Sequence, residues 1–173
     1  MPDIPVAPSP LIDIREADLS DPVDGAALLA LMEVYARDPM GGGQGLSAFT
    51  RAHLIEALAS RPSAHVILAL AAQEPAGLAI GLEGFSTFAC RPLLNIHDLV
   101  VAEAFRRQGV GRRLLQRAEV IARRLGCCKL TLEVLEGNGA AQAAYSSAGF
   151  RPYQLDPAMG RAQFWEKPLP DGG

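Results

Sequence analysis

The spacing of apolar residues changes several times along the chain, and each change predicts a new structural element. A spacing of three to four residues predicts helices at 22–36, 47–60, 109–125 and 138–148. Alternating or continuous apolar runs predict strands at 11–15, 65–71, 77–89, 94–101 and 129–134, and a final hairpin of 150–155 and 161–168.

Turn-forming residues separate these segments. Glu74-Pro75 and Arg91-Pro92 predict turns between strands, because proline favours bends and lacks a main-chain donor. Asp21 before Pro22 is typical of a helix start. The glycine-rich stretch 38–45 (DPMGGGQG) predicts a loop between the first two helices, either a plain connector or a mobile lid over a binding site.

The order of the elements predicts an α+β fold. The strand, helix and strand within 95–134 imply one parallel crossover, whereas the consecutive strands elsewhere imply antiparallel pairing. We therefore expect a mixed, mostly antiparallel central sheet flanked by helices on both faces. Residues 1–10 contain four prolines and are expected to form a flexible arm, with residues 11–169 as a single domain.

Composition narrows the functional classes. The net charge of −3 over 173 residues argues against nucleic-acid binding. The three cysteines include two adjacent ones, which fits neither a disulfide framework nor a metal site. The N-terminus lacks signal-peptide features and no apolar run is long enough to span a membrane, so the protein is expected to be cytoplasmic.

The clearest chemical signal is RRQGVGR at residues 106–112, between an apolar strand and a helix. A helix start presents unpaired N–H groups and a partial positive charge, and Gly109 and Gly111 leave room for a phosphate group. The segment lacks the ending of a P-loop. It matches only the start of a dinucleotide fingerprint, because Leu114 replaces the third glycine, and a tight structural turn is the simplest alternative.

These residues resemble the acetyl-coenzyme A-dependent N-acetyltransferases of the GNAT superfamily. The pattern R-x-x-G-x-G at 106–111 resembles the acyl-coenzyme A signature of that superfamily, and HDLVVAEAF before it resembles its fourth strand. The stretch 138–150 (NGAAQAAYSSAGF) resembles its second motif. The likeness covers about residues 65–168, with the N-terminal part matching more loosely.

The resemblance implies acetyl-coenzyme A as the donor and assigns roles to individual residues. Main-chain groups of the strand end should pair with the pantetheine arm, one N–H should hold the thioester oxygen, and the turn should bind the pyrophosphate. The residues so implicated are Leu99, Val100, Val101, Arg106, Arg107, Gln108, Gly109, Val110, Gly111 and Arg112. Asn138 should contact pantetheine, and Tyr145 should protonate the departing thiolate; the alternatives are a helix cap and an ordinary core tyrosine.

An amine acceptor must lose a proton before it attacks, and three residues are candidate bases. His97 is the first candidate, because histidine is the side chain best suited to exchange protons at neutral pH, and Asp98 and Glu83 are the next candidates, acting directly or through water. A regular strand would place His97 and Asp98 on opposite faces, so both could line one site only at a bulge. The resemblance implies such a bulge near Leu99.

The sequence therefore predicts an N-acetyltransferase that moves acetyl directly to a primary amine, in a ternary complex and without an acyl-enzyme. The alternative is a non-catalytic acyl-coenzyme A sensor on the same fold. The acceptor stays open among polyamine, amino acid, antibiotic and protein. No metal is expected, and a homodimer is an expectation at the level of the family.

Overall fold

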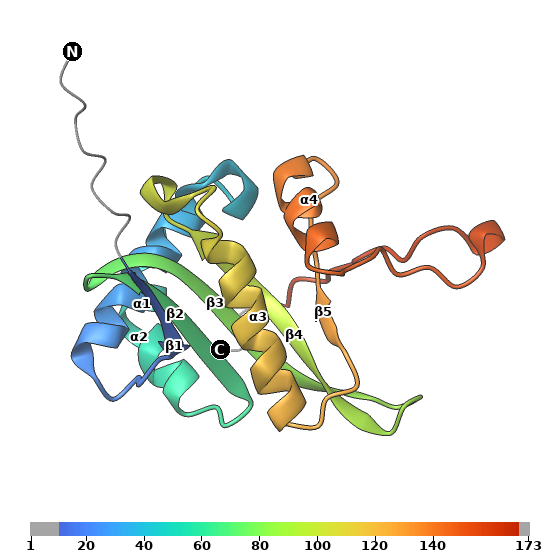
Figure 1. The fold of residues 1–173 in the computed structure, drawn as a ribbon, viewed down its shortest axis with the longest axis horizontal. Helices are drawn as coiled ribbons and strands as arrows, with labels where there is room; N and C mark the ends of the chain where they lie inside the picture. Colours follow the sequence, from blue (N-terminus) through green and yellow to red (C-terminus); the bar gives the residue numbers. More distant parts are fainter. Residues whose placement is uncertain (1–10, 170–173) are drawn as a thin grey trace, which may run out of the picture. The chain divides into compact units, whose positions relative to one another are not determined.

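The computed structural model describes residues 11–169, which fall into two compact units divided between Leu132 and Glu133 (Figure 1). The first unit contains, in order, β1 (Ile12–Glu16), α1 (Pro22–Arg37), η1 (Pro39–Gly41), α2 (Ala48–Ala59), β2 (Ala64–Ala71), β3 (Glu74–Ser86), β4 (Arg91–Val101), η2 (Glu103–Phe105), α3 (Val110–Arg124) and β5 (Leu130–Leu132). The second contains α4 (Gly139–Ser147) and the short helix η3 (Pro157–Met159). The single domain expected over 11–169 stays a prediction.

The five strands form one sheet in the order β1-β2-β3-β4-β5. The pairs β1–β2, β2–β3 and β3–β4 are antiparallel. Only β4 and β5 are parallel, and α3 makes the connection between them. The predicted α+β fold, with a mixed and mostly antiparallel sheet, is confirmed.

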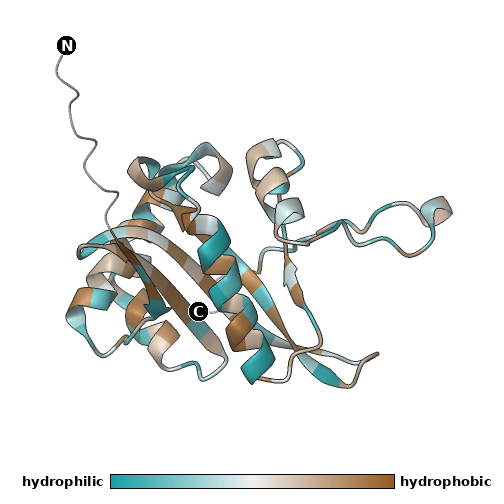
Figure 2. Cartoon of the chain, in the orientation of Figure 1, coloured by the Kyte–Doolittle hydropathy of each residue, from teal (hydrophilic) through white to brown (hydrophobic). Residues whose placement is uncertain are grey.

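The two faces of the sheet are covered by different helices. On one face, Leu28 and Leu31 of α1 pack against Leu68, Leu78 and Val100 in a buried core cluster. On the other face α3 crosses the sheet and turns a hydrophilic side away from it (Figure 2). We call these the α1 face and the α3 face. Successive residues of a strand alternate between them.

A part-buried ion pair joins α1 to β1. Asp21 caps α1 by accepting a hydrogen bond from Val23 N, as predicted. One turn later, Asp24 is only 1% exposed, and its carboxylate accepts from both terminal nitrogens of Arg15, at 2.6 and 2.7 Å. Asp18 N donates to the same carboxylate at 2.8 Å. These bonds lower the pKa of Asp24, chiefly through Arg15.

The turns predicted at the two prolines are wrong. Pro75 and Pro92 both lie inside strands, where they pair with Leu70 and Phe85. The chain instead reverses at Ala72 and Gln73, with φ of 48° and 75°. Proline is compatible with the ends of strands. The turn itself is made by Ala72 and Gln73, although alanine and glutamine rarely adopt a left-handed backbone.

The hairpin predicted over 150–168 is also wrong. No strand forms in residues 133–169, although Ala162 N of one expected arm donates a hydrogen bond to Tyr153 O of the other at 3.4 Å. Tyr153 and Phe164 are 62% and 75% exposed. A two-stranded hairpin without an apolar surface packed against it is marginal, and this explains the irregular backbone.

Candidate active site

The segment between β4 and α3 makes a sharp turn. Arg107 and Gly109 both have a left-handed backbone, with φ of 61° and 79°. Gln108 donates from its side chain to Ala104 O at 2.8 Å. The turn connects the end of β4 to the N-terminus of α3, as the strand-to-helix pattern predicted.

A run of main-chain donors in this turn has no acceptor in the described part of the chain. Among residues 11–169, the N–H groups of residues 107–112 make no hydrogen bond, and the first bond of α3 runs from Arg113 N to Gly109 O. Six consecutive donors at a helix start form a ready anion site, because the helix dipole adds positive potential there.

The two glycines of the turn differ in what requires them. Gly109 needs its left-handed φ, which side chains rarely adopt. Gly111 has no such φ, and a Cβ built on it would meet only Val101 Cγ2, at an ordinary 3.6 Å. The protein itself gives no steric reason for glycine at 111. Its absent side chain leaves space beside the unpaired donors, which fits a phosphate group in close approach.

Most of the arginines around the turn are already engaged. Five of the seven arginines between 103 and 124 have a partner: Arg106 with Asp38, Arg113 with Ile12 O, Arg117 and Arg124 with Glu16, and Arg123 with Glu119. Arg107 and Arg112 are exposed and have no ion pair within the described part of the chain. These two supply the uncompensated positive charge beside the donors.

The predicted bulge in β4 is confirmed, and it lies at His97. Asp98 pairs with Ile80 of β3, whereas Ile96 pairs with Gly81, so His97 is the extra residue. A regular strand would place Asp98 on the α3 face with Ile96. The bulge places it instead with Ile80 and Val100 on the α1 face.

Asp98 is the perturbed acid of this region. Burial raises its pKa, and the neighbouring charge of His97 opposes the rise. Its carboxylate makes no hydrogen bond or ion pair with residues 11–169. A half-buried carboxylate without a partner is uncommon in a structural role, and such groups gather at functional sites. The structure brings Asp98 and His97 together.

Glu83 belongs to a different cluster. It lies opposite Leu94, which shares the α3 face with Gly81, and His65 Nε2 lies 2.8 Å from its Oε1. The charge of Glu83, after burial, helps to raise the pKa of Cys127. The structure therefore separates Glu83 from Asp98 by the thickness of the sheet.

One edge of β4 is open beyond the bulge. β5 pairs only with residues 94–96, so among the described strands residues 98–101 have β3 as their sole neighbour. The bond from Ala102 N to Ala76 O sets the alternation along the antiparallel pair. The main-chain groups of Val100 therefore point to β3, and those of Leu99 and Val101 point to the open edge.

The two remaining candidates lie in the second unit. Asn138 caps α4 by accepting from Ala141 N at 3.1 Å, which is the structural alternative for that residue. Tyr145 meets Phe150 edge-to-face, with ring centroids 6.1 Å apart. The contacts of Asn138 with the donor and the proton transfer by Tyr145 stay predictions.

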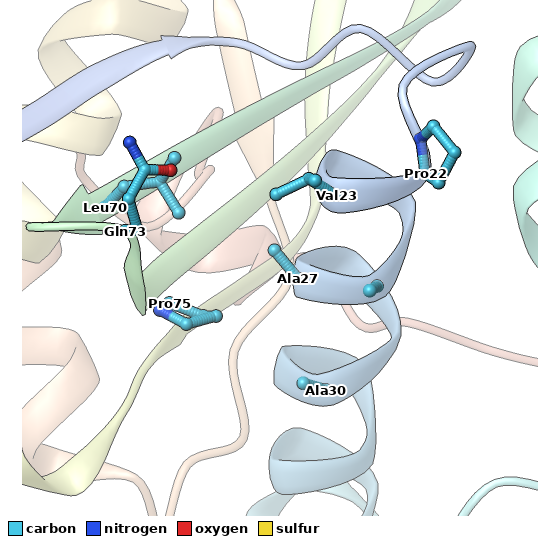
Figure 3. A pocket seen from close by; sticks show the side chains of 8 residues that line it. Pro22, Val23, Ala27, Ala30, Leu70, Gln73 and Pro75 are labelled. Atoms are coloured by element: carbon cyan, nitrogen blue, oxygen red, sulfur yellow. The ribbon is translucent and has the colours of Figure 1, made fainter.

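An apolar pocket of about 500 Å³ lies between the first half of α1 and the β2–β3 turn, where Val23, Ala27, Leu70 and Pro75 line it (Figure 3). Its lining contains no ionisable side chain, so it offers no acid–base chemistry. Over residues 11–169 there is no group of three potential metal ligands and no helix able to cross a membrane.

Comparison with known proteins settles the family. Residues 25–150 match the family model described as Acetyltransferase (GNAT) family. The chain belongs to this family. As in the sequence interpretation, the GNAT match includes β4, the turn and the start of α3.

Individual proteins that resemble the chain are acetyltransferases as well. A thialysine N-epsilon-acetyltransferase of Caenorhabditis elegans is 31% identical over 50% of this chain, and a streptothricin acetyltransferase of Streptomyces lavendulae is 38% identical over 46%. The chain spans about half the length of these relatives, 53% and 42%. The crystal structure of a probable acetyltransferase is 27% identical, with a TM-score of 0.75 over 92% of this chain and 99% of that one.

Proposed function

We propose that this GNAT protein transfers an acetyl group from acetyl-coenzyme A directly to a primary amine of a small cationic acceptor. The observation that carries the proposal is the run of unpaired N–H groups at 107–112, beside a glycine that the protein itself does not need. A diphosphate fits this site because it presents several anionic oxygens to converging donors.

The donor is held along the path from β4 to α3. The N–H groups of residues 107–112 bind the pyrophosphate, with Arg107 and Arg112 adding charge. Main-chain groups of Leu99 and Val101, which face the open edge of β4, pair with the pantetheine arm as an added strand would. Leu99 N–H then holds the thioester oxygen. Of the three strand residues predicted to pair with pantetheine, this assignment keeps Leu99 and Val101. It leaves out Val100, whose main-chain groups point to β3.

Asp98 removes the proton of the acceptor, with His97 beside it. A lysine-like amine has a pKa of about 10.4, so only about one molecule in 10³ is unprotonated at pH 7. A carboxylate whose pKa is raised by burial is a stronger base than an exposed one. Glu83, tied to His65 on the other face, is left out of this role.

The transfer exchanges one bond for another. The amine nitrogen attacks the thioester carbon, the C–N bond forms, and the C–S bond breaks. The departing thiolate takes a proton from Tyr145, as the resemblance implies, and the nitrogen gives up its second proton, through solvent, to the phenolate that remains. Among residues 11–169, no serine or cysteine makes a hydrogen bond to His97, Asp98 or Glu83, so nothing in the described chain favours an acyl-enzyme.

The acceptor class is supported by two arguments. An unpaired half-buried carboxylate attracts a cation, and a protonated amine is the cation that this chemistry consumes. The named relatives act on thialysine and streptothricin. A small cationic amine is therefore the acceptor that we propose.

Two measurements test this function. Calorimetry should show that coenzyme A binds at least 100-fold more tightly than pantetheine, which lacks the diphosphate. Thiol release from acetyl-coenzyme A should then rise with at least one amine among lysine, spermidine and kanamycin. Binding without transfer to any amine would support the sensor instead. An acetylated side chain trapped by mass spectrometry would refute direct transfer.

A further inference from the structure

Tyr35 lies in the last turn of α1, close to the start of the glycine-rich loop. Its ring is partly buried and packs against the core cluster of the α1 face. Gly41 lies directly on it: a Cβ at 41 would overlap Tyr35 O and come within 3.0 Å of Tyr35 Cδ2. The ring is thus held from both sides, by the core and by the loop.

The hydroxyl group of Tyr35 has no hydrogen-bond partner among residues 11–169. Tyr35 is half-buried, and its hydroxyl is accessible, so the oxygen is free to accept a hydrogen bond from a bound molecule. Burial raises the pKa of Tyr35, and the charges of Asp98 and Asp38 raise it further. The phenol therefore lies within the electrostatic reach of both carboxylates.

These two carboxylates differ in their availability. Asp38 accepts a hydrogen bond from Met40 N at 2.9 Å and pairs with Arg106 at 3.3 Å. Asp98 has neither kind of partner in the described chain and lies on the same face of the sheet as Tyr35. The α1 face thus combines one unpartnered carboxylate with one unpartnered hydroxyl.

An ammonium group satisfies both. It carries three N–H donors and no acceptor, so it can donate to a carboxylate and to a phenolic oxygen at once. We infer that Tyr35 binds the acceptor amine, its hydroxyl oxygen accepting one N–H while Asp98 takes the proton of another. This inference rests on the proposed acetyl transfer.

Holding the second N–H keeps the amine nitrogen in place after it loses a proton. When the proton moves from nitrogen to the carboxylate of Asp98, a neutral amine and a neutral carboxylic acid remain, and the new lone pair points along the broken N–H bond. The hydrogen bond to Tyr35 then holds the nitrogen while the amine turns that lone pair from Asp98 to the thioester carbon. Such restriction lowers the entropy cost of attack on the thioester.

The test replaces Tyr35 by phenylalanine, which removes only the oxygen. With the best amine among lysine, spermidine and kanamycin, Tyr35→Phe should lower kcat/KM for the amine about tenfold, the effect of one lost hydrogen bond. The Kd for coenzyme A and the thermal midpoint should not fall. Tyr153→Phe, at an exposed tyrosine, is the matched control and should keep the wild-type kcat/KM.

The possible outcomes separate the two proposals. If Tyr35→Phe keeps the wild-type kcat/KM for the amine, Tyr35 does not bind the acceptor and acetyl transfer stands. If the coenzyme A Kd weakens in parallel with the amine kinetics, the role of Tyr35 is structural and the inference fails. If the wild type transfers acetyl to no amine, the proposed function and the role of Tyr35 fall together.

Discussion

Asp98 on β4 lies opposite Ile80 on β3, although Ile96, two positions earlier, lies opposite the very next residue of β3. One inserted residue, His97, separates the two registers. The insertion reverses the face that Asp98 occupies and moves its carboxylate to the side of α1. A local irregularity of the strand thus decides where the only perturbed carboxylate of β4 can act.

Asp98→Asn tests the base. The amide cannot take the proton of an ammonium ion, so turnover with the amine should fall by about 10² to 10⁴. The Kd for coenzyme A should not change, because the donors of the turn are untouched. Glu83→Gln is the matched control, and thiol release should stay within about twofold of the wild type. Comparable losses in both variants would contradict the assignment of the base to Asp98.

The same substitution tests the pKa of Asp98 through stability. Burial raises the pKa in the folded protein above the unfolded value of about 3.9. At a pH between these two pKa values the folded state binds more protons than the unfolded state. The contribution of Asp98 to stability therefore falls as the pH rises. Asp98→Asn should therefore gain stability relative to wild type between pH 3.5 and pH 7, measured by urea unfolding. His97 and Tyr35, which interact electrostatically with Asp98, remain in both proteins. A difference that does not vary with pH would refute the raised pKa.

Alanine substitutions at Gly109 and Gly111 distinguish a glycine required by its backbone conformation from one required by a bound ligand. Gly111→Ala should leave stability unchanged or raise it by up to about 1 kcal/mol, because alanine favours helix and the site has room. It should nevertheless weaken coenzyme A binding, since the methyl group enters the space beside the donors. Gly109→Ala should cost about 1–2 kcal/mol through its left-handed φ. Calorimetry and urea unfolding measure both. Unchanged coenzyme A affinity in Gly111→Ala would count against the anion site.

Local patterns in the sequence were sufficient for the order of elements from β1 to α4 and for the turn at 106–111. Both depend on neighbours within a few residues, such as helix periodicity or glycine at a positive φ. The prolines at 75 and 92 misled the interpretation, because proline signals a turn only when no strand edge accommodates it.

Through-space partners lay beyond any local pattern. The sequence shows seven arginines near α3 but cannot show that Glu16, about a hundred residues earlier, neutralises two of them. For the same reason the sequence could not reveal that Tyr35 and Asp98 share the α1 face, or that Glu83 lies beside His65. The only feature of the sequence that could have drawn attention to Tyr35 is its position three residues before the glycine-rich stretch 38–45.

Tyr145→Phe tests the proton donor to the leaving group. Without the phenol, the thiolate must take its proton from water, and turnover should fall by about 10² to 10⁴. The Kd for coenzyme A should change little. An acetyl donor with a more acidic leaving thiol should recover part of the loss, because that thiol needs less help to depart. Equal losses with both donors, or unchanged turnover, would remove Tyr145 from the mechanism.

The ion pair of Arg15 and Asp24 predicts an asymmetric pair of variants. Asp24→Asn leaves Arg15 with access to water, so about 1.5–3 kcal/mol should be lost, as for hydrogen bonds to a charged group. Arg15→Met strands a carboxylate that is 1% exposed, which should cost about 3–5 kcal/mol at pH 7.

Acid should narrow this gap between the variants. The pKa of Asp24 is lowered by Arg15 in the wild type, so that stabilisation is lost as the pH falls through the folded pKa. In Arg15→Met the carboxylate has lost that partner and takes up a proton at a higher pH, which relieves its burial. Urea unfolding at pH 7 and pH 4 should therefore show Arg15→Met approaching Asp24→Asn. Equal destabilisation at both pH values would mean that the buried charge of Asp24 does not govern how α1 attaches to β1.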